Sequence, residues 1–211
     1  MPTDPKSDLE TAYALQTPEQ NREVYADWAK TYDGNFASRM DYHLPKMVAL
    51  IFAKNGLAST TVLDVGAGTG LLAESIPARG LLEIDAVDIS PQMLAVAAEK
   101  KIYRKTIEAD LTKPLDIADG TYGAIVSSGT FTHGHVGPEA LDELLRIART
   151  GAVFVLAIND AHFEARGFAE KFSALEPQVD GLKFQSVTIY GLGADVEHKD
   201  DTARIAVFRK R

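Results

Sequence analysis

Apolar residues follow two different spacings between residues 61 and 158, and the regular switch between the two predicts an α/β fold. Apolar runs of strand length lie at 61–65, 82–88, 106–109, 122–127 and 152–158. Between the runs, apolar residues recur every three or four positions, as in amphipathic helices, at 69–78, after Ser90-Pro91 and from Gly137-Pro138 to Gly151. Strands and helices that alternate in this way predict a parallel sheet covered on both faces.

The segments before and after this region have other patterns. Helices are predicted from Pro18 to about Lys30 and over 44–54, where Asn55-Gly56 ends the second one. A further helix is predicted over 163–175. The last two apolar segments, 183–190 and 202–208, have no helical segment between them, so they predict an antiparallel strand pair at the sheet edge.

These elements divide the chain into three parts. Residues 1–17 are expected to be a mobile N-terminus, 18–56 an N-terminal helical segment, and 57–211 an α/β core. The predicted core is a doubly wound, mostly parallel, seven-stranded sheet with an antiparallel C-terminal strand pair.

Composition narrows the classes of function. The chain of 211 residues has no cysteine, which excludes disulfides, thiolate chemistry and zinc sites built on cysteine. It has no apolar run of the ~20 residues that span a bilayer and no secretory signal, so we expect a cytoplasmic protein that does not bind membranes. The net charge of −8 makes nucleic acid an unfavourable partner.

A glycine-rich loop follows the first predicted strand. Gly66, Gly68 and Gly70 stand at alternate positions before a helix, and glycine lets a backbone approach a ligand closely. A dinucleotide fingerprint, G-x-G-x-x-G, would place its third glycine where Leu71 stands. The spacing therefore favours another nucleotide-type ligand, and a nicotinamide-dependent oxidoreductase stays an alternative.

Three carboxylates stand at or near the carboxyl ends of successive strands: Asp64, Asp88 and Asp110. Ligands of open α/β sheets bind at that edge. Asp88, 22 residues after Gly66, can accept hydrogen bonds from the ribose hydroxyls of an adenosine, although it could also be a solvated residue beside a helix cap. Asp110, which Leu111 follows, suits an adenine amine and ring, or else a turn.

The residues that carry these features resemble a known family. The run from Val62 to Gly70 resembles motif I of the class I S-adenosylmethionine-dependent methyltransferases, 86–94 their second motif and 108–111 their adenine motif. The resemblance extends over about two thirds of the chain, from Val24 to Ile158. Within the family, 25–33 and 129–141 are similar to the Williams–Beuren-region methyltransferase-like group.

The resemblance implies a Rossmann-like methyltransferase core, S-adenosyl-L-methionine as cofactor, and roles for particular residues. Gly66, Ala67 and Gly68 would line the methionine part while Asp64 orders the loop. Asp88 would bind ribose, and Ile89, Asp110 and Leu111 would hold adenine. Ser127 and Ser128 would border the sulfonium. Residues 18–56 would form a helical cover with Tyr25, Trp28 and Tyr32, whose helical spacing also suits plain core packing.

Chemistry adds two candidate residues. A sulfonium methyl is already activated, so positioning is the main requirement and a general base is needed only for a protonated nucleophile. His133 and His135, on the loop after 122–127, could accept that proton, or could be held by loop backbone. As a metal site the pair lacks a third ligand, so no metal is expected.

The sequence therefore predicts methyl transfer to a small-molecule acceptor. No Asn-Pro-Pro-Tyr-like run stands at 127–130, which further disfavours nucleic acid as the acceptor. The alternatives are the oxidoreductase and a non-catalytic S-adenosylmethionine-binding protein. The acceptor and the oligomeric state are left open.

Overall fold

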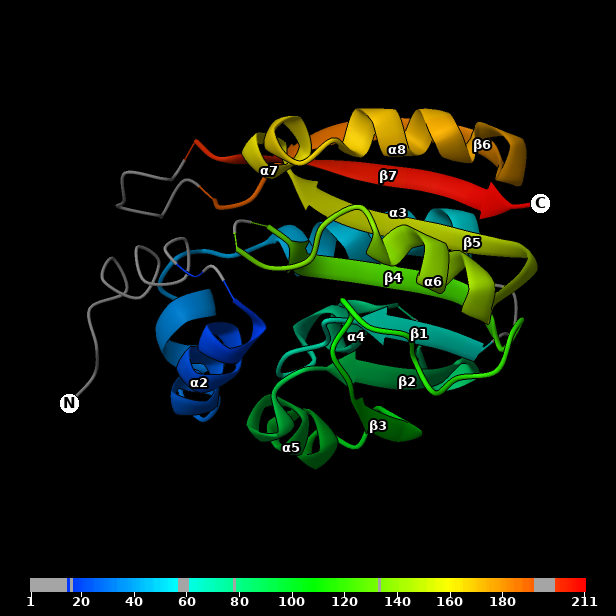
Figure 1. Ribbon diagram of the computed structural model, residues 1–211. Coiled ribbons are helices and arrows are strands. Elements are labelled where there is room, and N and C mark those ends of the chain that lie inside the picture. The colour runs from blue at the N-terminus through cyan, green and yellow to red at the C-terminus, as the bar shows by residue number, and fades with distance from the viewer. Residues whose placement is uncertain (1–14, 16, 57–60, 78, 133, 192–199) are drawn as a thin grey trace.

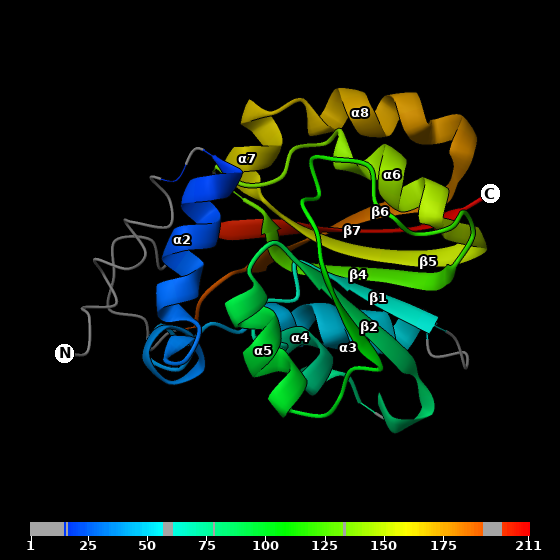
Figure 2. The same cartoon turned by 60° about the horizontal axis from the view of Figure 1, so that its bottom comes forward.

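The computed structural model describes residues 15, 17–56, 61–77, 79–132, 134–191 and 200–211. Most of the predicted mobile N-terminus, residues 1–14 and 16, lies outside the described residues. The elements form three layers, with a twisted sheet between two layers of helices (Figures 1 and 2). No helix in the described part of the chain is long and apolar enough to cross a membrane.

The sheet has seven strands in the order β3-β2-β1-β4-β5-β7-β6. Strands β1 to β5 are parallel, and β7 runs antiparallel to both β5 and β6. This confirms the predicted sheet and its antiparallel C-terminal pair. The strands are β1 Thr61–Val65, β2 Glu83–Asp88, β3 Lys105–Glu108, β4 Tyr122–Phe131, β5 Ala148–Asn159, β6 Val179–Thr188 and β7 Thr202–Lys210.

Helices cover both faces of the sheet (Figure 2). One face carries α3 (Leu44–Gly56), α4 (Leu71–Ser75) and α5 (Pro91–Glu99), and the other α6 (Ala140–Ile147), α7 (Asp160–Ala165) and α8 (Phe168–Leu175). The N-terminal helix α2 (Pro18–Trp28) lies beyond the carboxyl ends of the parallel strands and beside α5. Shorter turns are the π-helical η1 (Tyr32–Ala37) and the 3-10 turns η2 (Arg79–Leu81) and η3 (Glu176–Gln178).

Local sequence explains where several helices begin and end. The Ser90 hydroxyl accepts a hydrogen bond from the Met93 amide at 3.3 Å and caps α5, as predicted. Thr17 caps α2 in the same way through the Gln20 amide. Helix α4 is shorter than the predicted 69–78, because Ile76 precedes a proline and adopts the extended conformation that this position favours.

Several other predicted elements have different bounds in the structure. The helix opened by Gly137-Pro138 ends at Ile147 rather than Gly151, because Ala148 already pairs with Tyr122 at the start of β5. The segment 163–175 is two helices, separated where Gly167 adopts a positive φ of 76°. Strand β4 continues past residue 127 to Phe131, so the serines at 127 and 128 are strand residues.

Apolar residues along each strand alternate between two cores. On β1, Val62 packs with α3 and α4, whereas Leu63 and Val65 pack with α6 and α8. Each of these three side chains is fully buried. The alternation follows the period of two in a strand, and it explains why the central strands read as continuous apolar runs.

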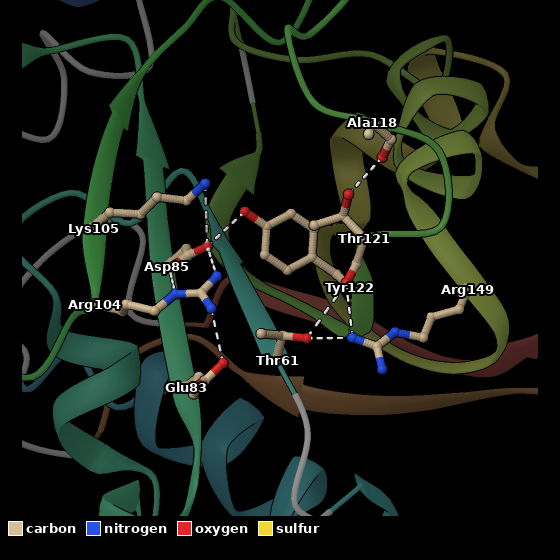
Figure 3. A network of polar contacts seen from close by, with 9 residues as sticks. All are labelled: Thr61, Glu83, Asp85, Arg104, Lys105, Ala118, Thr121, Tyr122 and Arg149. Carbon is tan, nitrogen blue, oxygen red and sulfur yellow. Dashed lines mark hydrogen bonds and ion pairs between the residues drawn. The ribbon is translucent and has the colours of Figure 1, made fainter.

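A polar network ties the amino ends of the strands together (Figure 3). The fully buried Asp85 of β2 receives Arg104 through both carboxylate oxygens, at 2.9 and 2.7 Å, and the Tyr122 hydroxyl at 2.8 Å. Arg149 donates to Thr61 and to the Thr121 carbonyl, and so holds the start of β5 against β1 and β4. The network thus lies at the edge of the sheet opposite the carboxyl ends of the parallel strands, where ligands bind in open α/β sheets.

Candidate functional site

The glycine loop lies where the order of the strands reverses. The chain moves from β1 outward to β2 and β3 and then returns to β4 on the other side of β1. In open α/β sheets the ligand crevice forms at this position, beyond the carboxyl ends of the strands. The amides of Gly66 and Ala67 both donate to the Val87 carbonyl, at 2.8 and 3.0 Å, which anchors the loop to β2.

Glycine is required at Gly66 for two reasons. Its φ is +65°, and a Cβ there would lie 1.9 Å from the Thr130 hydroxyl oxygen of β4. Both Ser127 and Thr130 donate to the Val65 carbonyl at 2.8 Å, so β4 packs directly beneath the loop. At Gly68, by contrast, no atom lies within 4 Å of the position of a Cβ, and the loop faces open space.

Asp88, at the end of β2, holds this open conformation. Its two carboxylate oxygens accept from the Gly68 amide and the Ser90 amide, each at 2.8 Å. Burial raises the pKa of Asp88, while these amide hydrogen bonds lower it. A carboxylate oxygen has two lone pairs, so each oxygen can still accept from a ligand hydroxyl.

Asp64 acts through a neighbour that the sequence did not single out. It is fully buried in β1 and accepts a 2.6 Å hydrogen bond from the Tyr103 hydroxyl. The Tyr103 ring lies against Gly70, where a Cβ would be 3.0 Å from it. Burial raises the pKa of Asp64 to about 7, and the Tyr103 hydrogen bond partly opposes this. Asp64 is therefore linked to the loop through Tyr103 and does not line the crevice.

Asp110 lies in a turn and also lines the crevice. One oxygen accepts from the Thr112 amide and hydroxyl, at 2.9 and 2.6 Å, and the other pairs with Lys113 at 2.9 Å. These contacts lower the pKa of Asp110 against the effect of burial, which raises it. The residue makes a turn and at the same time lines the crevice.

The N-terminal segment closes the crevice from outside through several polar contacts. The side-chain amide of Asn21 donates from Nδ2 to the Gly134 carbonyl at 3.0 Å. Arg22 forms an ion pair with Glu108 at 2.7 Å on the surface. Farther along, Asp33 in η1 accepts from the Thr69 hydroxyl of the glycine loop at 2.5 Å and from Lys100 at 2.7 Å. The cover is thus fastened to the loop that it covers.

The crevice beneath the cover holds about 950 Å³ of empty space, including the part open to solvent. We call it the loop cavity. Of the predicted site residues, it is lined by Tyr25, Tyr32, Gly66, Ala67, Gly68, Asp88, Ile89, Asp110, Leu111, Ser128 and His135. Its further lining residues include Asn21, Tyr42, Thr69, Met93, Thr130 and Val136.

A second cavity of about 520 Å³ adjoins the first, and we call it the aromatic cavity. Five residues line both: Tyr25, Tyr32, Tyr42, Gly129 and His135. The others are Phe36, Leu44, Phe131, Thr132, Ala157, Asn159, Ile189 and Tyr190. The two cavities therefore meet at a wall of tyrosine rings, one histidine and exposed strand backbone.

The tyrosines of this shared wall are neutral hydrogen-bonding groups near pH 7. Burial raises the pKa of Tyr25, Tyr32 and Tyr42, and the nearby Asp88 raises it further for the first two. The phenol groups can therefore donate hydrogen bonds or pack by their faces, but cannot take a proton as bases.

Three predicted site residues do not line the loop cavity. Ser127 is buried beneath the glycine loop, Asp64 contacts Tyr103, and Trp28 packs between Tyr25 and Phe36 in the cover. His133 lies outside the described residues. In the described part of the chain, no group of three acidic or histidine side chains could hold a metal ion.

Sequence reasoning missed Tyr42, which lines both cavities. It lies between two predicted helices in a stretch without periodicity, so no pattern singled it out. An isolated bridge pairs it with Tyr190, almost 150 residues later in the sequence.

Known proteins share the sequence around this site. Residues 63–156 match the family described as a methyltransferase domain. Human methyltransferase-like protein 27 is 30% identical over 181 residues, which are 83% of this chain and 71% of the human protein. The chain belongs to the class I S-adenosylmethionine-dependent methyltransferases. This favours the methyltransferase over the oxidoreductase that the glycine loop left open.

Other methyltransferases match over shorter stretches or by fold. The demethylmenaquinone methyltransferase of Thermobifida fusca is 37% identical over 112 residues, 51% of this chain and 47% of that enzyme. A SAM-dependent methyltransferase of Aquifex aeolicus has the same fold, with a TM-score of 0.58 and 19% identity, over 87% of this chain and 98% of the other. This chain thus spans most of the human relative but about half of the Thermobifida enzyme.

The loop cavity of this methyltransferase fits S-adenosylmethionine, its cofactor. The open face of Gly68 leaves room for a ligand to approach the backbone closely. Asp88 and Asp110 supply carboxylates, and Ile89, Leu111 and Met93 supply apolar surface for a base. Two negative charges also suit a cofactor that carries a sulfonium cation.

Proposed function

We propose that this methyltransferase transfers the methyl group to a small-molecule acceptor bound in the aromatic cavity, with the cofactor in the loop cavity. The observation that supports this most directly is the wall that the two cavities share. The rings of the N-terminal cover form part of that wall, so a bound acceptor would be shielded from water.

We assign the cofactor contacts as follows. Gly66, Ala67 and Gly68 border the methionine part, with Ser128 near the sulfonium, and Asp88 accepts from the ribose hydroxyls. Ile89, Asp110 and Leu111 hold the adenine. Tyr25 and Tyr32 cover the cofactor, and Trp28 supports them from behind. Asp64 and Ser127 act indirectly, because each positions the loop or strand that carries these contacts.

The bound cofactor supplies an activated methyl group, so the chain must chiefly hold the acceptor in line with it. His135 is the one residue shared by both cavities, among those described, that can accept a proton near neutral pH. Its ring lies 5.6 Å from that of Tyr25, and its backbone amide donates to the Thr132 carbonyl at 3.1 Å. We therefore assign His135 as the general base for an acceptor that must lose a proton.

Calorimetric titration with S-adenosylhomocysteine, and with NAD in parallel, tests the cofactor site. We expect binding of S-adenosylhomocysteine alone, and a loss of ~10-fold or more in affinity for Asp88→Ala, since two ribose hydrogen bonds would be lost. Folded protein that binds no S-adenosylhomocysteine would contradict the proposal.

His135→Gln tests the base. It should lower kcat by ~100-fold or more while the Kd of S-adenosylhomocysteine stays within a few fold, and it should remove the rise of the rate through the pH range of histidine titration. An unchanged pH profile would show that His135 is not the base. A chain that binds the cofactor product but transfers no label to a broad panel of acceptors would support the non-catalytic alternative.

A further inference from the structure

The described residues that line the aromatic cavity carry no formal charge. None of its thirteen lining residues is aspartate, glutamate, lysine or arginine, whereas the loop cavity includes Asp88 and Asp110. An ionised group placed in the aromatic cavity would lose water and find no opposite charge there, which is strongly unfavourable. The cavity thus selects against acceptors that carry a carboxylate, a phosphate or an ammonium group.

Aromatic rings form a continuous wall along one side of this cavity. Tyr32 stacks on Phe36 at a centroid distance of 5.1 Å, Phe36 meets Tyr42 edge-on at 6.0 Å, and Tyr42 meets Tyr190 at 5.8 Å. The rings come from η1, from the segment before α3 and from the segment just after β6. A wall that presents both faces and edges suits a flat ring, because aromatic pairs prefer offset and edge-to-face contacts.

One polar side chain of the wall has an unused donor. Asn159, at the end of β5, is 6% exposed, and its Oδ1 accepts a 3.1 Å hydrogen bond from the His162 amide. That bond caps α7 and fixes the orientation of the side-chain amide. No hydrogen bond from its Nδ2 is found among the described residues, and an amide donor in the lining of a cavity suits an acceptor oxygen of a ligand.

We propose that the methyl acceptor is an uncharged phenol, whose ring lies against the tyrosine and phenylalanine wall and whose hydroxyl oxygen accepts a hydrogen bond from Asn159. This inference rests on the proposed function of the two cavities. In the transfer the oxygen–methyl bond forms as the methyl–sulfur bond breaks, and the electron pair of the broken bond stays on sulfur. The phenol proton passes to His135, because the wall's tyrosines are too weakly basic to take it.

Three probes with the same phenol ring separate the classes: 4-ethylphenol is neutral, tyramine carries an ammonium group and 4-hydroxyphenylacetate a carboxylate. Each is titrated calorimetrically into the full chain saturated with S-adenosylhomocysteine. We expect 4-ethylphenol to bind at least ~10-fold more tightly than either charged probe. Equal affinities, a preference for a charged probe, or no binding of 4-ethylphenol would overturn the proposal.

Asn159→Asp tests the anchoring residue. Aspartate keeps the oxygen that caps α7 but adds a negative charge to the cavity, so 4-ethylphenol should bind ~10-fold less tightly and tyramine more tightly. Asn55→Asp makes the same charge change at the exposed end of α3 and should leave the ranking unaltered. An unaltered ranking in Asn159→Asp would remove Asn159 from the site. If this variant does not fold, the ranking of the three probes in the unaltered chain still decides the acceptor class.

The two proposals can fail separately. Binding of S-adenosylhomocysteine without binding of 4-ethylphenol would leave the methyltransferase site and reject the phenol. If the chain binds no S-adenosylhomocysteine, 4-ethylphenol is titrated into the chain alone. Binding of 4-ethylphenol would then keep the assignment of the aromatic cavity and reject the cofactor site.

Discussion

Asp64→Asn removes a carboxyl group that β1 buries beneath the glycine loop, and it should change how stability depends on pH. Burial raises the pKa of Asp64 from 3.8 to about 7, so between these values the folded protein holds a proton that the unfolded chain has released. The contribution of Asp64 to the free energy of unfolding then falls as pH rises through this window, and is level above it. The difference between the two pKa values corresponds to ~4 kcal/mol.

The asparagine variant keeps an oxygen that can accept from Tyr103 but cannot titrate. Its stability relative to the unaltered chain should therefore improve by ~4 kcal/mol between pH 4 and pH 8, a change set by the Asp64 shift alone because other groups titrate equally in both proteins. Urea unfolding of both proteins across this range measures the difference. Parallel profiles would refute the reasoning, since they would mean that Asp64 ionises alike in the folded and unfolded states.

Tyr103→Phe supplies an independent check on the same carboxyl group. The Tyr103 hydroxyl lowers the pKa of Asp64 by its hydrogen bond, so its removal should raise that pKa further and extend the falling part of the stability profile to higher pH. A profile that moves to lower pH instead would contradict this role of the hydrogen bond.

Three other changes test the loop, the strand network and the cover. Gly66→Ala should destabilise the chain by more than the ~1–2 kcal/mol of a left-handed backbone alone, because its Cβ would clash with Thr130, and thermal unfolding measures this. Arg104→Met should cost ~1–3 kcal/mol in chemical unfolding, because the buried Asp85 loses a charged donor but keeps Tyr122 and Lys105, and an unchanged stability would contradict the pairing. Asp33→Asn should speed dissociation of S-adenosylhomocysteine in stopped-flow by ~10-fold, since the cover loses a charged contact with the loop, and an unchanged rate would show that this contact does not hold the cover.

Local sequence was sufficient for most of the elements. The strands at 61–65 and 83–88 are buried on both faces, so they read as apolar runs, and Ser90-Pro91 marks the start of α5 by its own chemistry. The prediction failed where pairing decided the outcome. Gly151 is a plausible helix stop by residue type, but β5 had already begun at Ala148, because that residue pairs with Tyr122 in the neighbouring strand.

The three carboxylates show how much of a side chain's location can be predicted from its position in a strand. Their sequence positions correctly predicted that Asp64, Asp88 and Asp110 would gather at the carboxyl edge of the sheet. Only the fold separated them: Asp88 is the last residue of β2 and Asp110 lies just after β3, and both line the loop cavity, whereas Asp64 lies within β1 and contacts Tyr103. Side chains alternate between faces along a strand, so a shift of one residue decides which side a carboxylate serves.

The sequence by itself determined the alternating elements, the glycine loop and the family, because each depends on residues close together in the chain. The aromatic cavity was decided only by tertiary structure. Tyr42, Asn159 and Tyr190 come from three distant segments with no shared periodicity, and they meet because the antiparallel strands β6 and β7 bring the end of the sheet back to the N-terminal cover. A wall assembled from long-range contacts leaves no local pattern, and for that reason the aromatic cavity could be found only in the folded chain.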